Sequence, residues 1–182
     1  MPAGNESNSG QESLIKEQLR VEIESTCQDF HQLLDDVPGE MLDKLSRNPE
    51  WTIRETLYHM SLAPRNLPSD VRMIRHLKWV PKLPAGPFNR LNRYLTRRGA
   101  RNLDKAALAA RYDEAHTRTI DTLETIQDQE WALGVDYPDW DPMLSRFVTL
   151  ERLFHYIRLH FETHAEEIRS VVSPNESKHV EQ

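Results

Sequence analysis

The segment HYIRLHFETHAEEI, residues 155–168, places three histidines within ten positions of one predicted helix. At roughly 100° per residue, His160 and His164 fall on one stripe at the edge of an apolar face, whereas His155 lies far around the helix. Two imidazoles one turn apart can present their nitrogens to a single metal ion. The alternative is a pair of partly buried histidines whose polar atoms are satisfied by neighbouring groups. The spacing therefore makes His160 and His164 candidate ligands and leaves His155 outside the set.

Two well-known metal motifs do not fit this chain. In HFETH the glutamate stands one place too late for the HExxH motif of zincin peptidases. Di-iron bundles need two Glu-x-x-His motifs on facing helices, and the only helical approximation here is Asp113 with His116. A two-histidine site therefore needs a third ligand from another helix. His59, in TLYHM, lies beside the apolar stripe of its predicted helix, and periodicity alone leaves it open between a ligand and a surface residue.

The helical spacing of apolar residues predicts the elements that would position these histidines. The second helix begins near Ile53, because Thr52 and Glu55 form a capping-box signature directly before it. Pro64 and Pro68 remove backbone donors, so we expect this helix to break or kink there. The other long helices are predicted over about 14–34, 104–126 and 149–172.

Shorter segments connect these helices. A helical turn is predicted over 38–45 and a helix over 70–79, followed by a loop at 80–88 (VPKLPAGPF) and a short basic helix at 89–98. The aromatic and acidic stretch at 128–142 is predicted as a loop. Four long helices, with a long irregular basic crossover between the second and the third, indicate an all-α fold, a four-helix bundle.

The length of 182 residues suits one compact domain. We assign this domain to residues 13–172, with polar tails over 1–12 and 173–182 that we expect to be disordered. No run approaches the ~18–20 apolar residues that a membrane span needs. A single cysteine, Cys27, cannot form an internal disulfide and is expected to pack as a small core residue. With no signal-peptide pattern at the start, these features favour a soluble cytoplasmic protein with no membrane association.

Charge is distributed unevenly along the chain. The net charge is −6, yet residues 65–101 hold ten basic side chains and a single acid, Asp70. Arg90, Arg93 and Arg97 in this segment are spaced for one helical face. That stripe could be a solvated surface or a contact with an acidic helix, a site for an anionic ligand, or a nucleic-acid contact. The acidity of the whole chain argues against nucleic acid as a partner.

Both segments that carry candidate ligands resemble motifs of one family. WTIRETLYHM resembles the W-[ST]-x-x-E-x-L-x-H motif that opens the second helix in the DinB/YfiT-like superfamily, and HFETHAEEI resembles its last-helix motif, H-x-x-x-H-x-x-[QE]-I. The resemblance extends over about residues 14–172. It implies an up-down-down-up four-helix bundle with a divalent metal ion near one end, held by His59, His160 and His164. Such a set leaves positions open for water or substrate and accepts Zn, Ni, Fe or Co.

The resemblance also implies a metal-dependent enzyme that acts on a small-molecule substrate. Characterised relatives include transferases and isomerases that use low-molecular-weight thiols, and hydrolases. A thiol cofactor that carries carboxylates would suit Arg90, Arg93 and Arg97. Glu167 could orient a ligand histidine or serve as a catalytic acid or base, and the alternative is an ordinary exposed helical glutamate.

Other interpretations stay open. Tyr156 on the histidine stripe, and Tyr137, Trp140 and Asp141 in the preceding loop, could line a pocket mouth, and the aromatic residues could equally cap the bundle core. The competing class of function is a non-catalytic bundle, either a binding or sensor module or a structural dimer. Bundles of this kind often pair through helix faces, so a homodimer is expected. A DNA-damage or stress-related context is attached to the family name, and this acidic chain gives it weak support.

Overall fold

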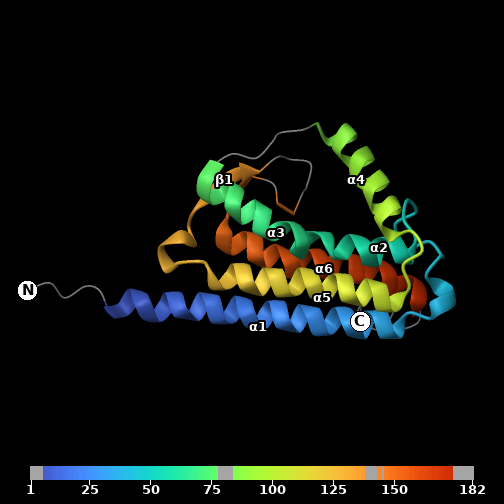
Figure 1. Cartoon of the computed structure of the whole chain (residues 1–182), viewed down its shortest axis with the longest axis horizontal. Coiled ribbons are helices and arrows are strands. Elements are labelled where there is room, and N and C mark those ends of the chain that lie inside the picture. The colour runs from blue at the N-terminus through green and yellow to red at the C-terminus, as the bar shows by residue number, and fades with distance from the viewer. Residues whose placement is uncertain (1–5, 78–83, 138–142, 145, 174–182) are drawn as a thin grey trace, which may run out of the picture.

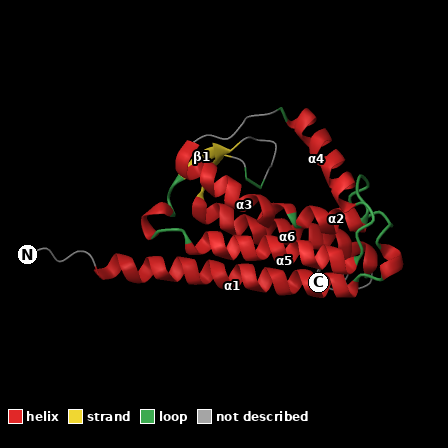
Figure 2. Cartoon of the chain, in the orientation of Figure 1, coloured by secondary structure: helices red, strands yellow, loops and turns green. Residues whose placement is uncertain are grey.

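The computed structural model describes residues 6–77, 84–137, 143–144 and 146–173. Four long helical segments run side by side: α1 (Glu6–Asp36), α2 (Ile53–Met60) continued by α3 (Leu62–Arg72), α5 (Lys105–Glu124) and α6 (Leu150–Val172). The segments α1 and α6 run in one direction, and α2–α3 and α5 run in the other (Figure 1). Helix dominates the described chain (Figure 2). The predicted up-down-down-up four-helix bundle is therefore confirmed.

Each long segment packs against two others. The segments α5 and α6 both contact α1 and α3, so α1 and α2–α3 lie at opposite corners of the bundle. The apolar core forms two clusters, one toward each end. In α6, Ile157 belongs to the first cluster and Phe161 to the second, so His160 lies where the two meet. Among the described residues, no helix has the length and apolarity needed to cross a membrane.

The first helix is longer than its apolar spacing predicts. It begins at Glu6, well before Leu14, and ends at Asp36 ahead of Pro38. Residues 6–12, which we assigned to a tail, are therefore helical. Extending a nucleated helix costs far less than starting one, so α1 includes Ser7–Gly10 despite their middling to poor helix propensity. The tail residues 1–5 and 174–182 lie outside the described chain. A short 3-10 helix, η1 (Gly39–Met41), falls within the turn predicted over 38–45.

The second helix begins at the predicted capping box. The Glu55 amide donates to the Thr52 hydroxyl oxygen at 3.2 Å, and the Thr52 amide donates to the Glu55 carboxylate at 2.9 Å. The break comes at Ser61, earlier than the prolines themselves. The reason is that Pro64 has no N–H to donate to the carbonyl of Met60.

Both prolines are accommodated within α3. Pro64 lies in its first turn, where backbone amides have no helical partner in any case. Pro68 leaves the Pro64 carbonyl without its usual donor, and the hydroxyl of Thr119 on α5 lies 3.0 Å from that oxygen. The helix therefore continues past both prolines and passes into a π-helical segment, η2 (Met73–Leu77), which together with α3 covers the described part of the helix predicted over 70–79.

The crossover is more helical than the sequence suggests. The helix α4 (Ala85–Ala100) includes residues 85–88, which we expected in a loop, and extends the helix predicted over 89–98. That prediction was wrong because Pro84 and Pro87 flank the start of α4, where a proline favours a helix rather than breaking it. The helix packs against α2 so closely that a Cβ at Gly99 would overlap the Tyr58 ring. It returns the chain to the end of the bundle where α5 begins (Figure 1).

A two-stranded antiparallel sheet precedes the last helix. It pairs β1 (Gly134–Tyr137) with β2 (Arg146–Thr149), so that Val135 lies opposite Val148 and Tyr137 opposite Arg146. The loop predicted over 128–142 is thus wrong for β1, because a four-residue strand is too short for its alternation to stand out. The strand β2 leads directly into α6, whose first turn is capped by the hydroxyl of Thr149.

Candidate metal centre

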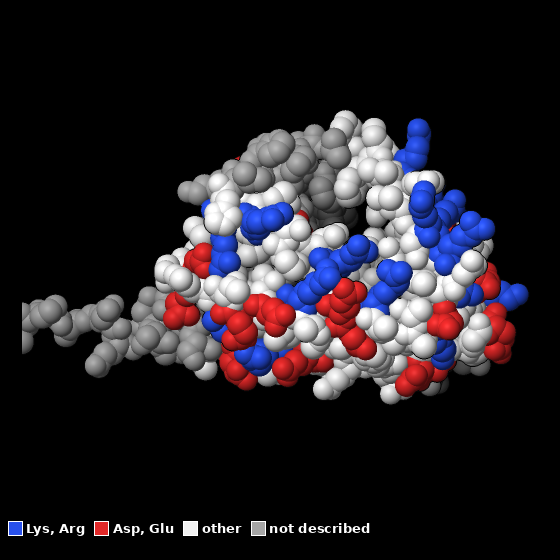
Figure 3. Space-filling view, viewed as in Figure 1, with Lys and Arg blue, Asp and Glu red and all other residues white. Residues whose placement is uncertain are grey.

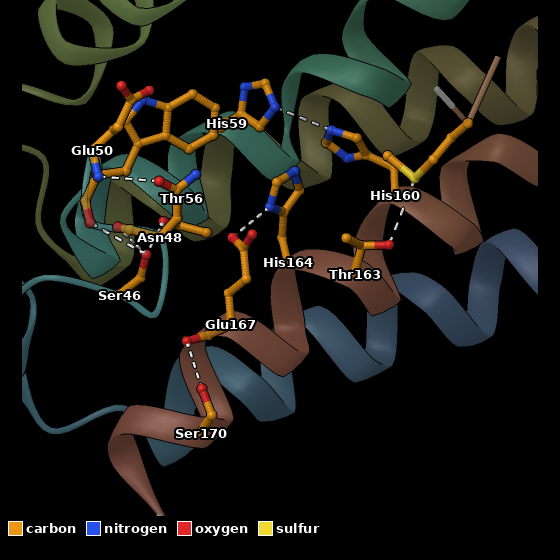
Figure 4. Close-up of polar contacts among 12 residues, drawn as sticks. Ser46, Asn48, Glu50, Thr56, His59, His160, Thr163, His164, Glu167 and Ser170 are labelled. Carbon is orange, nitrogen blue, oxygen red and sulfur yellow. Dashed lines mark hydrogen bonds and ion pairs between the residues drawn. The ribbon is translucent and has the colours of Figure 1, made fainter. Parts of the chain in front are cut away.

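The packing of α2 on α6 brings three histidines together. His59 lies in the last turn of α2, and His160 and His164 lie one turn apart on the buried face of α6. Their ring centroids are 4.9 Å (His59 to His160), 5.0 Å (His59 to His164) and 4.6 Å (His160 to His164) apart. One nitrogen from each ring lies within 4.8 Å of those of the other two. We call these three residues the histidine centre (Figure 4).

The donor set of the histidine centre fits a divalent metal ion. Nε2 of His59 and Nε2 of His160 lie 3.2 Å apart. This distance is close to the roughly 3.3 Å that separates two nitrogens bound tetrahedrally to one zinc ion. The second nitrogen of His59, Nδ1, is buried and has no hydrogen-bond partner among the described residues. Among the described residues, no hydrogen bond therefore fixes this ring from its far side.

Burial keeps two of these imidazoles neutral. Desolvation, with a smaller contribution from His164, lowers the pKa of His59 to about 3. His160 is only 4% exposed, and desolvation followed by repulsion from His59 and His164 holds its pKa well below the usual value. The neutral imidazole is the form that binds a metal ion, so neither group has to lose a proton at pH 7.

Glu167 contacts the third histidine directly. Its carboxylate Oε2 lies 2.9 Å from Nδ1 of His164, three residues earlier on α6 (Figure 4). A carboxylate at this distance favours the tautomer with a proton on Nδ1, which leaves the lone pair of Nε2 free to bind a metal ion. The Glu167 backbone carbonyl also accepts from the amide of Arg47 at 3.0 Å, which ties this turn of α6 to the loop before α2. Of the roles predicted for Glu167, the contact favours orientation of His164.

Two aromatic side chains cover the histidine centre. The Trp51 ring lies 4.3 Å from the ring of His59 and 6.0 Å from that of His164, measured between centroids. It is buried, so it shields both imidazoles from water on the side of the loop. Tyr156 lies 5.3 Å from His160, on the same stripe of α6, as the sequence predicts. Trp51 opens the WTIRETLYHM segment, but nothing in the spacing indicated that it would contact the histidines.

The histidine centre opens into a cavity of about 350 Å³. Figure 3 shows a hollow in the surface beside α4. One stripe of α2–α3 and one stripe of α6 form its walls, and the first half of α4 and the chain around the two strands complete it. Tyr137 lines the cavity and also belongs to the first core cluster, so both alternatives left open for it apply. Trp140 and Asp141 lie outside the described residues. The lining includes Asn66 and Asp70 of α3, Phe88, Asn89 and Asn92 of α4, and Tyr156 of α6.

Asp70 is a residue of this cavity to which the sequence gave no role. Burial raises the pKa of its carboxyl to about 7, although a hydrogen bond from Tyr137 partly offsets the effect. The one feature of the sequence that distinguishes Asp70 is that no other acidic residue occurs within the basic segment 65–101. Asp70 therefore places an acidic group in the cavity to which the histidine centre opens.

The arginine stripe predicted for an anionic ligand does not reach the cavity. Arg93 forms an ion pair with Glu50, and Arg97 donates to the Glu50 carbonyl at 2.9 Å. Nε of Arg97 also lies 3.8 Å from the Glu55 carboxylate, whereas Arg90 is exposed. None of the three lines the cavity. The stripe thus holds α4 against the acidic start of α2. This arrangement agrees with one of the alternatives predicted for the stripe, a contact with an acidic helix.

A second group of potential ligands lies between α1 and α5. Cys27, His31 and Asp113 bring their ligand atoms within 4.8 Å of one another, and we call them the α1–α5 cluster. Nε2 of His31 lies 2.7 Å from the Asp113 carboxylate, and the Cys27 thiol lies 3.8 Å from it. Burial and then the charge of Asp113 raise the pKa of the Cys27 thiol to about 11. His155 belongs to neither group and contacts Glu22 at 3.0 Å on the exposed side of α6.

Residues 22–168 match the sequence profile of the DinB superfamily. A search of curated proteins finds no significant match. Two crystal structures share the fold: the mycothiol-dependent maleylpyruvate isomerase (TM-score 0.66, 13% identity, 86% of this chain covered) and a histidine-to-alanine mutant of that enzyme (TM-score 0.64, 13% identity, 84% covered). The chain spans 61% and 60% of their respective lengths. At this identity the likeness concerns the fold.

Proposed function

Because the chain belongs to the DinB superfamily, we propose that it is a divalent-metal-dependent enzyme. In this proposal it transfers a low-molecular-weight thiol to a small-molecule substrate, or uses the thiol as a co-substrate in converting that substrate. The observation that carries the proposal is the histidine centre, in which three imidazoles converge beside a cavity of about 350 Å³. A structural site needs no such cavity, whereas a catalytic site needs room for a substrate next to its metal. The isomerase of similar fold is described as mycothiol-dependent, which supports a thiol as co-substrate.

The ligand set in this proposal is His59, His160 and His164, each through one imidazole nitrogen. When bound, a divalent ion would lower the pKa of a thiol or a water molecule and polarise a carbonyl group. Three imidazoles accept zinc, nickel, iron or cobalt, so the identity of the metal depends on its supply.

The other side chains around the histidine centre have separate tasks in the proposal. Glu167 fixes the ring of His164 through the 2.9 Å contact and is a positioning residue. Trp51 packs on two of the imidazoles and keeps water from that side. The apolar residues Leu62, Leu67 and Leu153 line the cavity and lower its polarity, which strengthens electrostatic interactions within it.

Hydrolysis is the second candidate reaction, since the same histidine centre can serve to activate water. A non-catalytic metal-binding or structural bundle is the alternative from another class. The cavity beside the histidine centre favours an enzyme over this alternative, because it leaves the imidazoles open to a ligand.

The proposal is tested with protein purified without an affinity tag, reconstituted with zinc or nickel, and titrated with cysteine, glutathione and mycothiol by calorimetry. We expect at least one thiol to bind, and binding to disappear in His160→Ala. If no thiol binds to metal-loaded protein, thiol transfer is rejected. Turnover of small carboxylic esters by the same samples would then favour hydrolysis, and its absence would favour the non-catalytic alternative.

A further inference from the structure

The cavity has two chemically different ends. On α2–α3 it is lined by residues 59, 62, 63, 66, 67 and 70, which share one helical face. On α6 it is lined by residues 153, 156, 160 and 164, and α6 runs antiparallel to α2–α3. His59 therefore lies near His160 and His164 at one end, while Asp70 lies toward Leu153 at the other. Eleven helical residues span roughly 16 Å, so a ligand held at the histidine centre can extend to Asp70.

Among the described residues, the far end of the cavity carries no positive charge. Of the described residues that line the cavity, none is lysine or arginine, and Asp70 is the only acid. Asp70 forms no ion pair with any described residue; its hydrogen bond comes from Tyr137. Arg75, one turn further along, is engaged with the Glu130 carboxylate at 2.6 Å and with the Thr125 carbonyl at 2.8 Å. A carboxylate on a ligand would therefore meet a partly buried acid and no described compensating cation.

Apart from Asp70, the histidine centre and the hydroxyl groups of Tyr137 and Tyr156, the polar groups of the described cavity lining are amides. Asn66 of α3 and Asn89 and Asn92 of α4 line it from two sides. An asparagine side chain both donates and accepts, so it suits hydroxyl and amide groups on a ligand. A carboxylate accepts hydrogen bonds and attracts cations, so Asp70 suits a hydroxyl, an amide N–H or an ammonium group.

From this arrangement we infer that the cavity binds an uncharged or cationic ligand rich in hydroxyl, amide or amine groups, with Asp70 as the residue that excludes carboxylates. This inference rests on the proposed function, in which the other end of the same ligand is a thiol at the histidine centre. It differs from the expectation drawn from the sequence, a carboxylate-bearing thiol held by Arg90, Arg93 and Arg97, since those arginines lie outside the cavity. Like charges in a site of low polarity repel far more strongly than in water, so Asp70 repels a ligand carboxylate above pH 7, where its own carboxyl, with a pKa of about 7, is ionised.

The test compares three small thiols that differ in charge: 1-thioglycerol (neutral), cysteamine (cationic) and mercaptosuccinate (dianionic). Each is titrated by calorimetry into zinc-loaded protein at about pH 8.5, where the Asp70 carboxyl is ionised, and the zinc content is measured afterwards to exclude removal of the metal. We expect thioglycerol and cysteamine to bind at least tenfold more tightly than mercaptosuccinate. Asp70→Asn, which keeps the shape of the side chain, should reduce that ratio to threefold or less. Asp136→Asn is the matched control, because Asp136 lies on β1 with its side chain exposed.

The outcomes separate the inference from the proposed function. If mercaptosuccinate binds as tightly as thioglycerol, the inference is overturned while a thiol function stands. If no thiol binds, the thiol function is rejected. The inference is then tested separately by adding glycerol, ethanolamine or malate and following the NMR signals of the asparagine side-chain amides. Shifts of the Asn66, Asn89 and Asn92 signals with glycerol or ethanolamine but not with malate support it. Equal shifts with malate, or no shift with any of the three, overturn it.

Discussion

The histidine centre and the α1–α5 cluster each bring three potential metal ligands within 4.8 Å of one another, yet their surroundings differ. In the α1–α5 cluster, Asp113 is exposed and already accepts from both His31 and Cys27. In the histidine centre, the three side chains are imidazoles with no carboxylate among them, and two of the three are buried. The comparison teaches that closeness of ligand atoms is not sufficient. In the histidine centre the Glu167 carboxylate stands behind His164, so one nitrogen of each imidazole is left to face a cation beside the cavity. In the α1–α5 cluster the carboxylate is itself one of the three ligands and is already engaged by the other two.

The largest expected effect is on metal affinity. His160→Ala should weaken metal binding more than roughly 100-fold, beyond the range typical of residues that only support a ligand. His31→Ala in the α1–α5 cluster should leave the affinity within twofold of wild type. Competition with a chromogenic chelator measures both variants under the same conditions. Equal losses in the two variants would remove the distinction between the two groups.

The next effect concerns the reactivity of Cys27. A pKa raised from 9.0 to about 11 lowers the thiolate fraction at pH 8 about 100-fold, and the thiolate is the nucleophile. Alkylation by iodoacetamide, followed by mass spectrometry, should therefore be far slower in the folded protein than in urea. Asp113→Asn should accelerate it, since the charge of Asp113 helps to raise the pKa. Rapid alkylation of the native protein would instead mark Cys27 as a reactive thiol.

A smaller effect is expected at the residue that orients His164. Glu167→Gln keeps the size of the side chain but removes the charge that favours a proton on Nδ1, so metal affinity should fall by about 10- to 100-fold. Glu166→Gln, at the exposed neighbouring position, is the control and should change the affinity by less than twofold. If both variants behave alike, the contact between Glu167 and His164 has no role in the histidine centre.

The smallest predicted effect is a change of stability at Asp70. The pKa of this carboxyl is raised from 3.8 to about 7, so the folded protein resists its ionisation. Stability is therefore lost as the pH rises from 4 through 7, because the unfolded chain releases this proton first. Asp70→Asn removes the loss and should raise the thermal midpoint by a few degrees at pH 8, with the gain disappearing toward pH 4. A gain in the thermal midpoint that is equal at pH 8 and at pH 4 would show that Asp70 is not the titrating group.

Much of the bundle could be predicted from the sequence because its signals are periodic and local. The apolar spacing gives the four long segments, and the capping box at Thr52 and Glu55 marks the start of α2. The helical spacing of roughly 100° per residue also separates His155 from His160 and His164, and in the structure His155 has a different partner from the other two. The pairing of α2 with α6, which brings His59 to the histidine centre, came from the family resemblance and not from periodicity.

The features that the sequence did not reveal depend on long-range contacts. The passage of α3 beyond Pro68 is accompanied by a hydroxyl on α5, Thr119, which no local pattern indicates. The arginine stripe on α4 is spaced for one face, but only the packing of α4 on α2 shows that Glu50 and Glu55 occupy it. Asp70 stood out by charge, yet its place in the cavity follows from how α3, α4 and α6 meet. The single domain over 13–172, the cytoplasmic location and the homodimer stay predictions.

The central claim is that the histidine centre, and not the α1–α5 cluster, is the metal site. A crystal of untagged protein soaked in zinc, with anomalous diffraction recorded on both sides of the zinc absorption edge, tests it most directly. The account predicts one strong anomalous peak at about 2.0–2.1 Å from a nitrogen of each of His59, His160 and His164. A peak confined to Cys27, His31 and Asp113, or no peak beside the three imidazoles, would contradict it.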